Sequence, residues 1–181
     1  GLGDAPVCSI AVGESVLPTD PTNLTLDECD RLVPAALDGK AVHVGHYLEP
    51  RLVYTTEGYL TAPTAVEGRR TMHIGIDLFA PDGRPVHAPL EGEVVTAIDR
   101  PNLQDYGGTV VLRHTTDDGD AFFTLYGHLD PASIAGLKTG DRLGSGALFA
   151  NLGSSAVNGG WQPHLHFQLA MCLPDGETAS V

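Results

Sequence analysis

The sequence carries two histidines, one on either side of Leu165, near its C-terminal end. On a β-strand, residues two apart project from the same face, so the imidazoles of His164 and His166 would point to one side while Leu165 and Phe167 fill the other. Two imidazoles on one face are half of a metal site. Taken alone, the pair fits a solvated polar strand face equally well.

A second pair of metal-ligating residues, His73 and Asp77, lies in a run that also has strand character. Residues four apart share a strand face, and Gly75 between them leaves space for another group to approach closely. Two imidazoles and one carboxylate from two strands would make an open tetrahedral zinc site, with the fourth position left to water. Zinc lowers the pKa of such a water to about 7, so the pattern predicts hydrolytic chemistry.

A hydrolytic zinc site also needs a group that accepts a proton. The sequence lacks the His-Glu-x-x-His motif, so the glutamate base of the usual metalloprotease helix is missing. A spare imidazole is then the natural base. From the residues alone, the candidates are whichever of His164 and His166 is not on the metal, and His128, which follows an aromatic run.

The elements that position these side chains are predicted to be short strands bounded by glycine or proline. Such spacing favours an all-β core over residues 70–171, built as a sandwich or barrel, in which the His73/Asp77 strand and the His164/His166 strand are neighbours in one sheet. One helical turn is expected between Pro131 and Leu137. The predicted strands are Met72–Phe79, Pro85–His87, Gly92–Ile98, Gly108–His114, Ala121–Leu129, Leu148–Leu152 and His164–Ala170.

Residues 1–68 differ in composition and are predicted to form a lead-in segment that packs on the domain of residues 69–181. A short helix over residues 24–33 is expected, capped by Thr22 or Asn23. Three large apolar side chains lie in an otherwise polar, turn-rich stretch and need cover. We therefore expect them to anchor the lead-in segment near the mouth of the cleft; they are Tyr47, Leu48 and Tyr54.

The composition excludes several classes of partner. With 23 acidic and 10 basic residues the net charge is -13, which argues against nucleic acid as a partner, and Arg69-Arg70 is too short to be a phosphate-binding patch. No apolar run reaches the roughly 18–20 residues that span a bilayer, and no signal peptide is visible. The three cysteines are far apart and form no CxxC pair, which suits a reducing, cytoplasmic setting.

The remaining histidines are expected to lie outside the metal site, because none has a carboxylate or imidazole partner at ligand spacing. They are His43, His46, His87 and His114. Trp161 could either cover the core or form a wall for the substrate.

Four segments occur in the order and spacing of one known family: HIGIDLFAPDGRPVHAPLEGEVV, TLYGHL, GDRL and PHLHFQL. Over roughly residues 70 to 170 the chain resembles the lysostaphin-type zinc metallopeptidases, often peptidoglycan endopeptidases. The resemblance implies an all-β duplicated hybrid motif that hydrolyses peptide bonds with Zn²⁺. It assigns the zinc ligands to His73, Asp77 and His166, and the catalytic roles to His128 and His164.

A narrower resemblance reaches back into the lead-in segment through VGHYLEPRLVYTTEGY and forward to NGGWQPHLHFQL. These segments resemble the version of the domain that lies between a kinase-like phosphotransferase domain and a class III aminotransferase in bacterial fusion proteins. The resemblance implies covalently linked neighbouring domains and a cytoplasmic location, where peptidoglycan is rarely met. NGGWQP also departs from the Gly/Ser/Thr-rich approach to His-x-His in the secreted enzymes.

Other classes of function compete with the peptidase. Strand-turn segments such as APLEGEVV also occur in biotinyl or lipoyl carriers, but Lys40 and Lys138 are the only lysines and neither has the required setting. A phosphocarrier-like module would use a pair of histidines yet would not need Asp77. A non-catalytic metal-binding module within a larger enzyme is the remaining alternative.

Overall fold

The computed structural model describes residues 43–45, 47–51, 54, 56–60, 68 and 70–173. The helix expected over residues 24–33 lies outside the described residues, as do His46 and Arg69.

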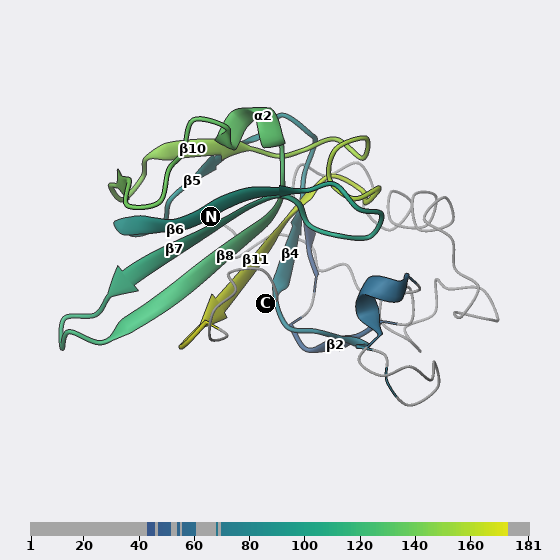
Figure 1. Ribbon diagram of the computed structural model, residues 1–181, viewed down its shortest axis with the longest axis horizontal. Coiled ribbons are helices and arrows are strands. Elements are labelled where there is room, and N and C mark those ends of the chain that lie inside the picture. Colours follow the sequence, from purple (N-terminus) through teal and green to yellow (C-terminus); the bar gives the residue numbers. More distant parts are fainter. Residues whose placement is uncertain are drawn as a thin grey trace.

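A seven-stranded antiparallel sheet forms the larger layer of the fold (Figure 1). Its strands follow the runs of β-branched and aromatic residues, which pack well on a pleated surface. In spatial order they are β1 (His43–Val44), β4 (Ile76–Phe79), β11 (His164–Ala170), β8 (Ala121–Leu129), β7 (Gly107–Thr115), β6 (Gly92–Arg100) and β9 (Arg142–Leu143). The two-residue strand β9 was not predicted from the sequence.

A smaller layer covers one face of this sheet (Figure 1). It consists of the paired strands β5 (Pro85–His87) and β10 (Leu148–Asn151), with the short helix α2 (Pro131–Ile134) beside them. Buried apolar side chains from both layers make one core, among them Val86, Leu112, Tyr126, Ile134 and Phe149. The predicted all-β class with antiparallel sheets is confirmed over the residues that the structure describes.

Alternation along β11 separates the core from the opposite face of the sheet. Leu165 and Phe167 pack against the core, while His164, His166 and Gln168 are buried on the other side. This is the period of two expected for a strand with different surroundings on its two faces. The candidate site therefore lies on the face that β5, β10 and α2 do not cover.

The single strand predicted over Met72–Phe79 is wrong, because the chain bends at Ile74 and Gly75. His73 lies in β3 (Met72–His73), which pairs with β2 (Glu49–Pro50) in a separate two-stranded sheet. A Cβ on Gly75 would lie 2.5 Å from Cε1 of His166 and 2.9 Å from the carbonyl oxygen of Phe167, so only glycine fits at the bend. The predicted pairing with β11 is confirmed for Asp77, which lies opposite His166, and is wrong for His73.

The lead-in segment supplies strands as well as side chains. Strands β1 and β2 pair with β4 and β3, and the 3-10 helix η3 (Glu57–Tyr59) follows them. Tyr54 is buried as expected, but Tyr47 and Leu48 are 62% and 52% exposed, so these two are not anchors. They form the turn between β1 and β2, whose side chains face solvent. The boundary near residue 68 stays a prediction.

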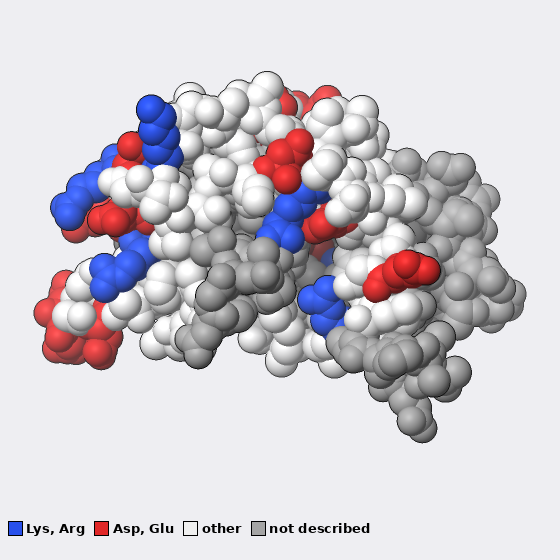
Figure 2. Space-filling view, in the orientation of Figure 1, with Lys and Arg blue, Asp and Glu red and all other residues white. Residues whose placement is uncertain are grey.

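Acidic side chains gather at the tip of the β7–β8 hairpin in the face shown in Figure 2, where Asp117, Asp118 and Asp120 are all exposed. Among the described residues, no helix has the length and apolar character needed to cross a bilayer.

Candidate metal centre

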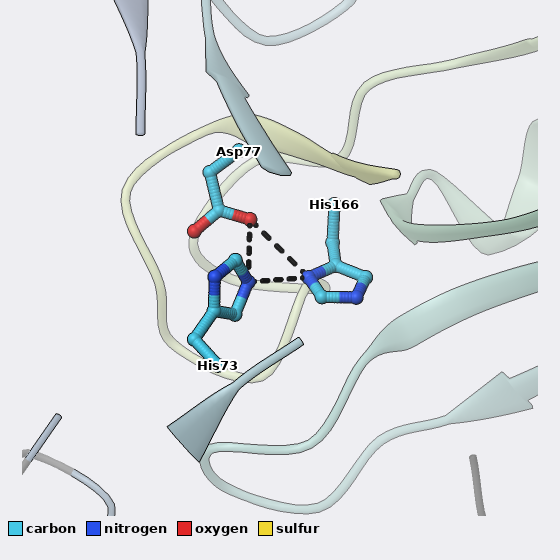
Figure 3. Close-up of side chains that lie close together, drawn as sticks. All are labelled: His73, Asp77 and His166. Carbon is cyan, nitrogen blue, oxygen red and sulfur yellow. Dashed lines mark hydrogen bonds and ion pairs between the residues drawn. The ribbon is translucent and has the colours of Figure 1, made fainter. Parts of the chain in front are cut away.

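Three buried side chains from separate strands converge at the site (Figure 3): His73 from β3, Asp77 from β4 and His166 from β11. Nε2 of His73 lies 2.8 Å from Nδ1 of His166, and each of these nitrogens lies 3.2 Å from Oδ1 of Asp77. One donor atom from each residue thus occupies a corner of a small triangle. We call these residues the His–Asp–His triad.

The triad fits zinc by the chemistry of its donors. Two imidazole nitrogens and one carboxylate oxygen are a common zinc ligand set, and spacings near 3 Å are those of atoms that share one ion. Burial lowers the pKa of His73, although its bond to Asp77 acts in the opposite direction. This favours the neutral imidazole, which is the form that binds metal.

Asp77 is ionised in spite of its burial. Burial alone would raise the pKa of this carboxyl group, but the charge of Arg51, followed by the interactions with the neighbouring imidazoles, holds its pKa well below the usual range. The second carboxylate oxygen, Oδ2, forms an ion pair with Nη2 of Arg51 at 2.7 Å. Oδ1 is left as the oxygen that faces the two imidazoles.

Sequence reasoning missed Arg51. Its side chain is only 4% exposed and comes from the lead-in segment, directly after β2. No periodic pattern marks it, because its partner Asp77 belongs to a distant strand. The pairing of β2 with β3 is what brings it to the site.

Gln168 was also missed, although its position two residues after His166 on the same strand face could have indicated it. Its Oε1 lies 3.3 Å from Nε2 of His166. A histidine that binds metal through Nδ1 carries its proton on Nε2, and the amide oxygen of Gln168 is placed to accept that proton.

His164 adjoins the triad, with its Nε2 at 3.6 Å from Oδ1 of Asp77. Its Nδ1 donates a hydrogen bond to the carbonyl oxygen of Gln162 at 2.5 Å, which leaves Nε2 unprotonated. Burial lowers the pKa of His164 to about 4. The ring is therefore neutral at pH 7 and its centroid lies 4.2 Å from that of His128.

His128, at the end of β8, has a backbone conformation that is rare for residues other than glycine, with φ at 63°. Hydrogen bonds hold it there, from its own N–H to Tyr106 O and from Gly153 N–H to its carbonyl oxygen. Its Nδ1 donates to the carbonyl oxygen of Asn158 at 2.9 Å. Burial, followed by the nearby His164 and His166, lowers its pKa well below the usual value.

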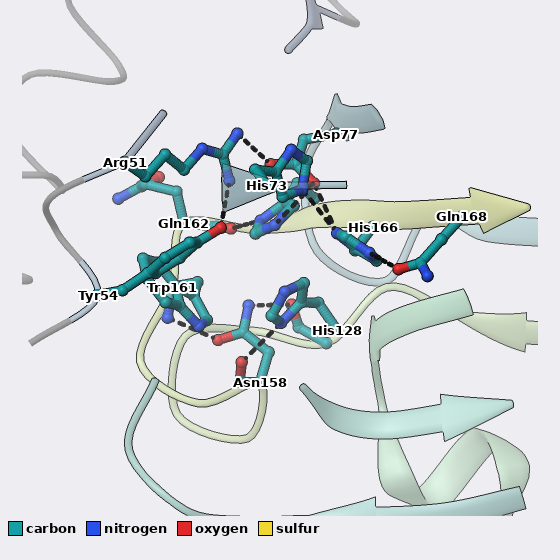
Figure 4. A network of polar contacts seen from close by, with 12 residues as sticks. Arg51, Tyr54, His73, Asp77, His128, Asn158, Trp161, Gln162, His166 and Gln168 are labelled. Atoms are coloured by element: carbon teal, nitrogen blue, oxygen red, sulfur yellow. Dashed lines mark hydrogen bonds and ion pairs between the residues drawn. The ribbon is translucent and has the colours of Figure 1, made fainter. Parts of the chain in front are cut away.

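One residue, Asn158, supports both His128 and Trp161 (Figure 4). Its carbonyl oxygen accepts from His128, and its side-chain Oδ1 accepts from the backbone N–H of Trp161 at 3.0 Å. Gly159 and Gly160 both have φ at 86°, and a Cβ on Gly159 would collide with the carbonyl oxygen of Asp105. The NGGW segment is thus a tight glycine turn that fixes these side chains.

A cleft opens beside the triad, and aromatic side chains form much of its wall. Tyr54 stacks on Tyr59 with ring centroids 4.3 Å apart, and the edge of Trp161 meets Tyr54 at 6.1 Å. Two of these rings belong to the lead-in segment, as does Arg51. Of the three predicted anchors, Tyr54 lies at the cleft, beside Arg51 and Tyr59, which were not predicted there.

The other candidate residues lie outside the triad. His87 is exposed on β5, while His114 is buried and bonded to Glu91 O and Thr124 Oγ1. For His43 the structure describes the backbone, which lies in β1. Arg70 donates a hydrogen bond to the carbonyl oxygen of Gly58 and lies over the Tyr59 ring. It is thus a positively charged side chain in the wall of the cleft.

Comparison with known proteins places these residues in a family. The model of peptidase family M23 matches residues 71–177. The DD-carboxypeptidase/endopeptidase Mpg of Neisseria meningitidis is 36% identical over 137 residues, which are 72% of this chain and 28% of that protein. The glycyl-glycine endopeptidase ALE-1 of Staphylococcus capitis is 32% identical over 111 residues, which are 61% of this chain and 27% of that protein. The chain thus spans about a quarter of the length of these relatives.

Among solved structures, the catalytic domain of lysostaphin from Staphylococcus simulans is 30% identical, with a TM-score of 0.43 over 64% of this chain and 79% of that domain. The match to the family model covers more than half of the sequence, and it includes every residue of the triad as well as His128 and His164. The chain belongs to peptidase family M23.

Proposed function

We propose that this protein is a zinc metallopeptidase that hydrolyses peptide bonds, with zinc held by His73, Asp77 and His166. The observation that carries the proposal is the convergence of three buried donor atoms at 2.8–3.2 Å from one another. A zinc ion there would polarise a peptide carbonyl and lower the pKa of a water to about 7.

Two histidines beside the triad, His128 and His164, would carry out the proton transfers. His128 and His164 both donate through Nδ1 to a backbone carbonyl, so the Nε2 of each is free of a proton and can accept one from the attacking water. The same nitrogen can then return the proton to the leaving amine. Gln168 orients His166, and Arg51 orients Asp77.

We propose peptides with small residues as the substrate class. The activities for which two relatives are named support this, since one is a glycyl-glycine endopeptidase and the other a DD-carboxypeptidase/endopeptidase.

Metal content is the first test of this function. Protein purified without chelator should hold one zinc per chain by mass spectrometry, and Asp77→Ala should lose it. The zinc-loaded protein should then cleave members of a peptide library that includes glycine-rich and D-amino-acid-containing sequences. Full zinc without any cleavage would favour a non-catalytic metal-binding module, while absence of zinc would favour a phosphocarrier-like role.

We further propose that the chain is one module of a longer cytoplasmic protein, linked to phosphotransferase and aminotransferase domains, with no nucleic acid or membrane as partner. The support is the sequence resemblance of the lead-in segment and of the NGGWQPHLHFQL segment. Immunoblotting of the source cells with an antibody to residues 70–173 would measure the size and compartment of the native protein. A free domain in the cell envelope would contradict this proposal.

A further inference from the structure

Arg70 is a positively charged side chain of the cleft to which the proposed reaction gives no role. Its side chain is exposed and lines the cleft together with the triad. Its Nη2 donates to the carbonyl oxygen of Gly58 at 2.8 Å, and its guanidinium carbon lies 5.4 Å from the centroid of the Tyr59 ring. A guanidinium carries five N–H donors, so most of its hydrogen-bonding capacity stays open to solvent or to a ligand.

Both the backbone and the side chain of Arg70 are held by η3. Its backbone N–H donates to the carbonyl oxygen of Tyr59 at 2.8 Å, next to the Gly58 carbonyl that holds the side chain. The Tyr59 hydroxyl is in turn bonded to the carbonyl oxygen of Gln104. A cation that is already held in place loses less conformational entropy when it binds a ligand.

The charge of Arg70 is not balanced within the cleft. Of the described residues that line the cleft, the other charged side chains are Arg51 and Asp77, which pair with each other at 2.7 Å. No carboxylate among the described residues forms an ion pair with Arg70, although the chain has 23 acidic residues against 10 basic ones. With the histidines neutral, as metal binding requires, Arg70 leaves the cleft wall with a net positive charge.

We infer that Arg70 binds a carboxylate of the peptide substrate, either the C-terminal carboxylate or that of an acidic side chain. This assignment rests on the proposed function and adds a charged group to the substrate class. The flat guanidinium fits a carboxylate through two parallel hydrogen bonds. Because Arg70 shares one cleft with His73, the carboxylate would lie on the same peptide as the bond that is cleaved.

Hydroxamates test this inference, because their metal-binding group fixes one end of the ligand at the zinc. We would first confirm bound zinc by mass spectrometry, and then measure affinities by calorimetry for two matched pairs. The first pair is the monohydroxamate of succinic acid joined to glycyl-glycine, with a free C-terminal carboxylate or as the amide. The second pair is acetyl-glutamyl-glycine hydroxamate and acetyl-glutaminyl-glycine hydroxamate. The first pair tests a C-terminal carboxylate and the second an acidic side chain.

In at least one pair the carboxylate ligand should bind about 3- to 10-fold more tightly than its neutral partner, as expected of one charge-assisted contact at an exposed site. Arg70→Gln should remove this difference and leave the affinity for the neutral ligand and for acetohydroxamate unchanged. Arg70→Lys should keep part of it. Arg142→Gln is the matched control, because it removes one exposed arginine elsewhere and should keep the whole difference.

The possible failures are distinguishable. A zinc-loaded protein with equal affinities within both pairs, or a difference that persists in Arg70→Gln, would overturn the inference and leave the proposed function intact. Loss of acetohydroxamate binding in both Arg70→Gln and Arg70→Lys would also overturn it, since Arg70 would then support the cleft and not the ligand. Absence of bound zinc would overturn the proposed function at the first step, and the inference would fall with it.

Discussion

At the scale of single residues, the two histidines beside the triad have their protonation pattern set by the backbone. Carbonyl oxygens of Gln162 and Asn158 can only accept, so each histidine keeps its proton on Nδ1. Burial lowers the pKa of both rings, which keeps them neutral at pH 7, with Nε2 unprotonated. The strained φ of His128 belongs to the same arrangement, since unusual backbone conformations cluster at functional sites.

Because the histidines have different roles, replacing each of them by alanine should have a different effect. His128→Ala should keep zinc, because His128 is not part of the triad, yet lose about 10²–10⁴ in turnover, the usual effect of removing a positioned acid or base. His166→Ala should lose zinc and activity together. Zinc content and peptide hydrolysis measured on the same samples check this, with the exposed His87→Ala as the control. Loss of zinc in His128→Ala would mean that the roles are assigned wrongly.

Replacing Arg51 should change the stability of the folded protein, because Arg51 balances a buried charge. Arg51→Met would leave the buried carboxylate of Asp77 without its ion-pair partner, which should lower the free energy of unfolding of the zinc-free protein by about 3–5 kcal/mol. Adding Asp77→Asn to this variant removes the unpaired charge and should restore part of the loss. Urea denaturation measures both effects.

The matched control for Arg51 is Arg142→Met. Arg142 pairs with Glu93 at 3.9 Å on the surface, so its removal should change the free energy of unfolding by less than about 0.5 kcal/mol. If Arg51→Met were as mild as this control, Arg51 would not be needed to hold the charge of Asp77.

At the scale of elements, the bend between β3 and β4 is what brings His73 to the triad. Gly75→Ala should displace the His166 ring, because the added Cβ would lie 2.5 Å from its Cε1 atom. We expect weaker zinc binding, measured by competition with a chelator. Gly144→Ala is the control, since a Cβ there meets nothing within 4 Å. Equal zinc affinity in the two variants would show that the site tolerates the extra methyl group.

The sequence predicts the strands of the site correctly where the evidence is local, that is, where side chains alternate between the two faces of one strand. The alternation of His164, Leu165 and His166 gave the correct faces of β11, because the period of two is local. The break at Gly75 was not predictable in the same way, since it depends on where the His166 ring lies in three dimensions. Arg51 and the lead-in strand β2 likewise reach the site only through long-range pairing.

At the scale of the whole molecule, the lead-in segment and the β domain form one site. Thr56 N–H donates to Gln104 Oε1 at 3.0 Å, and Tyr59 Oη donates to Gln104 O at 2.6 Å, which ties η3 to the loop after β6. The cleft wall built from Tyr54 and Tyr59 is therefore anchored to the loop next to Asp105, against which the NGGW turn packs. Two segments that are far apart in the sequence thus pack against the same loop and fix this part of the cleft wall.

The buried histidines make the stability of the zinc-free protein depend on pH. His164 has a pKa of about 4 in the folded state against about 6.5 when unfolded, so between these values the unfolded chain binds a proton that the folded chain does not. Stability should therefore fall as the pH is lowered from 6.5 towards 4, by about 3 kcal/mol for His164 alone. The lowered pKa values of His128 and His73 act in the same direction.

Urea denaturation of zinc-free protein at pH 7, 6 and 5 measures this dependence. His164→Gln should flatten the slope, because the buried group no longer titrates, whereas His87→Gln changes an exposed histidine and should leave the slope as it is. Zinc at saturation should raise stability most at pH 7, since ligand protonation weakens metal binding as the pH falls. A zinc-free protein whose stability stays constant or rises from pH 7 to pH 5 would mean that these imidazoles are not neutral in the folded state.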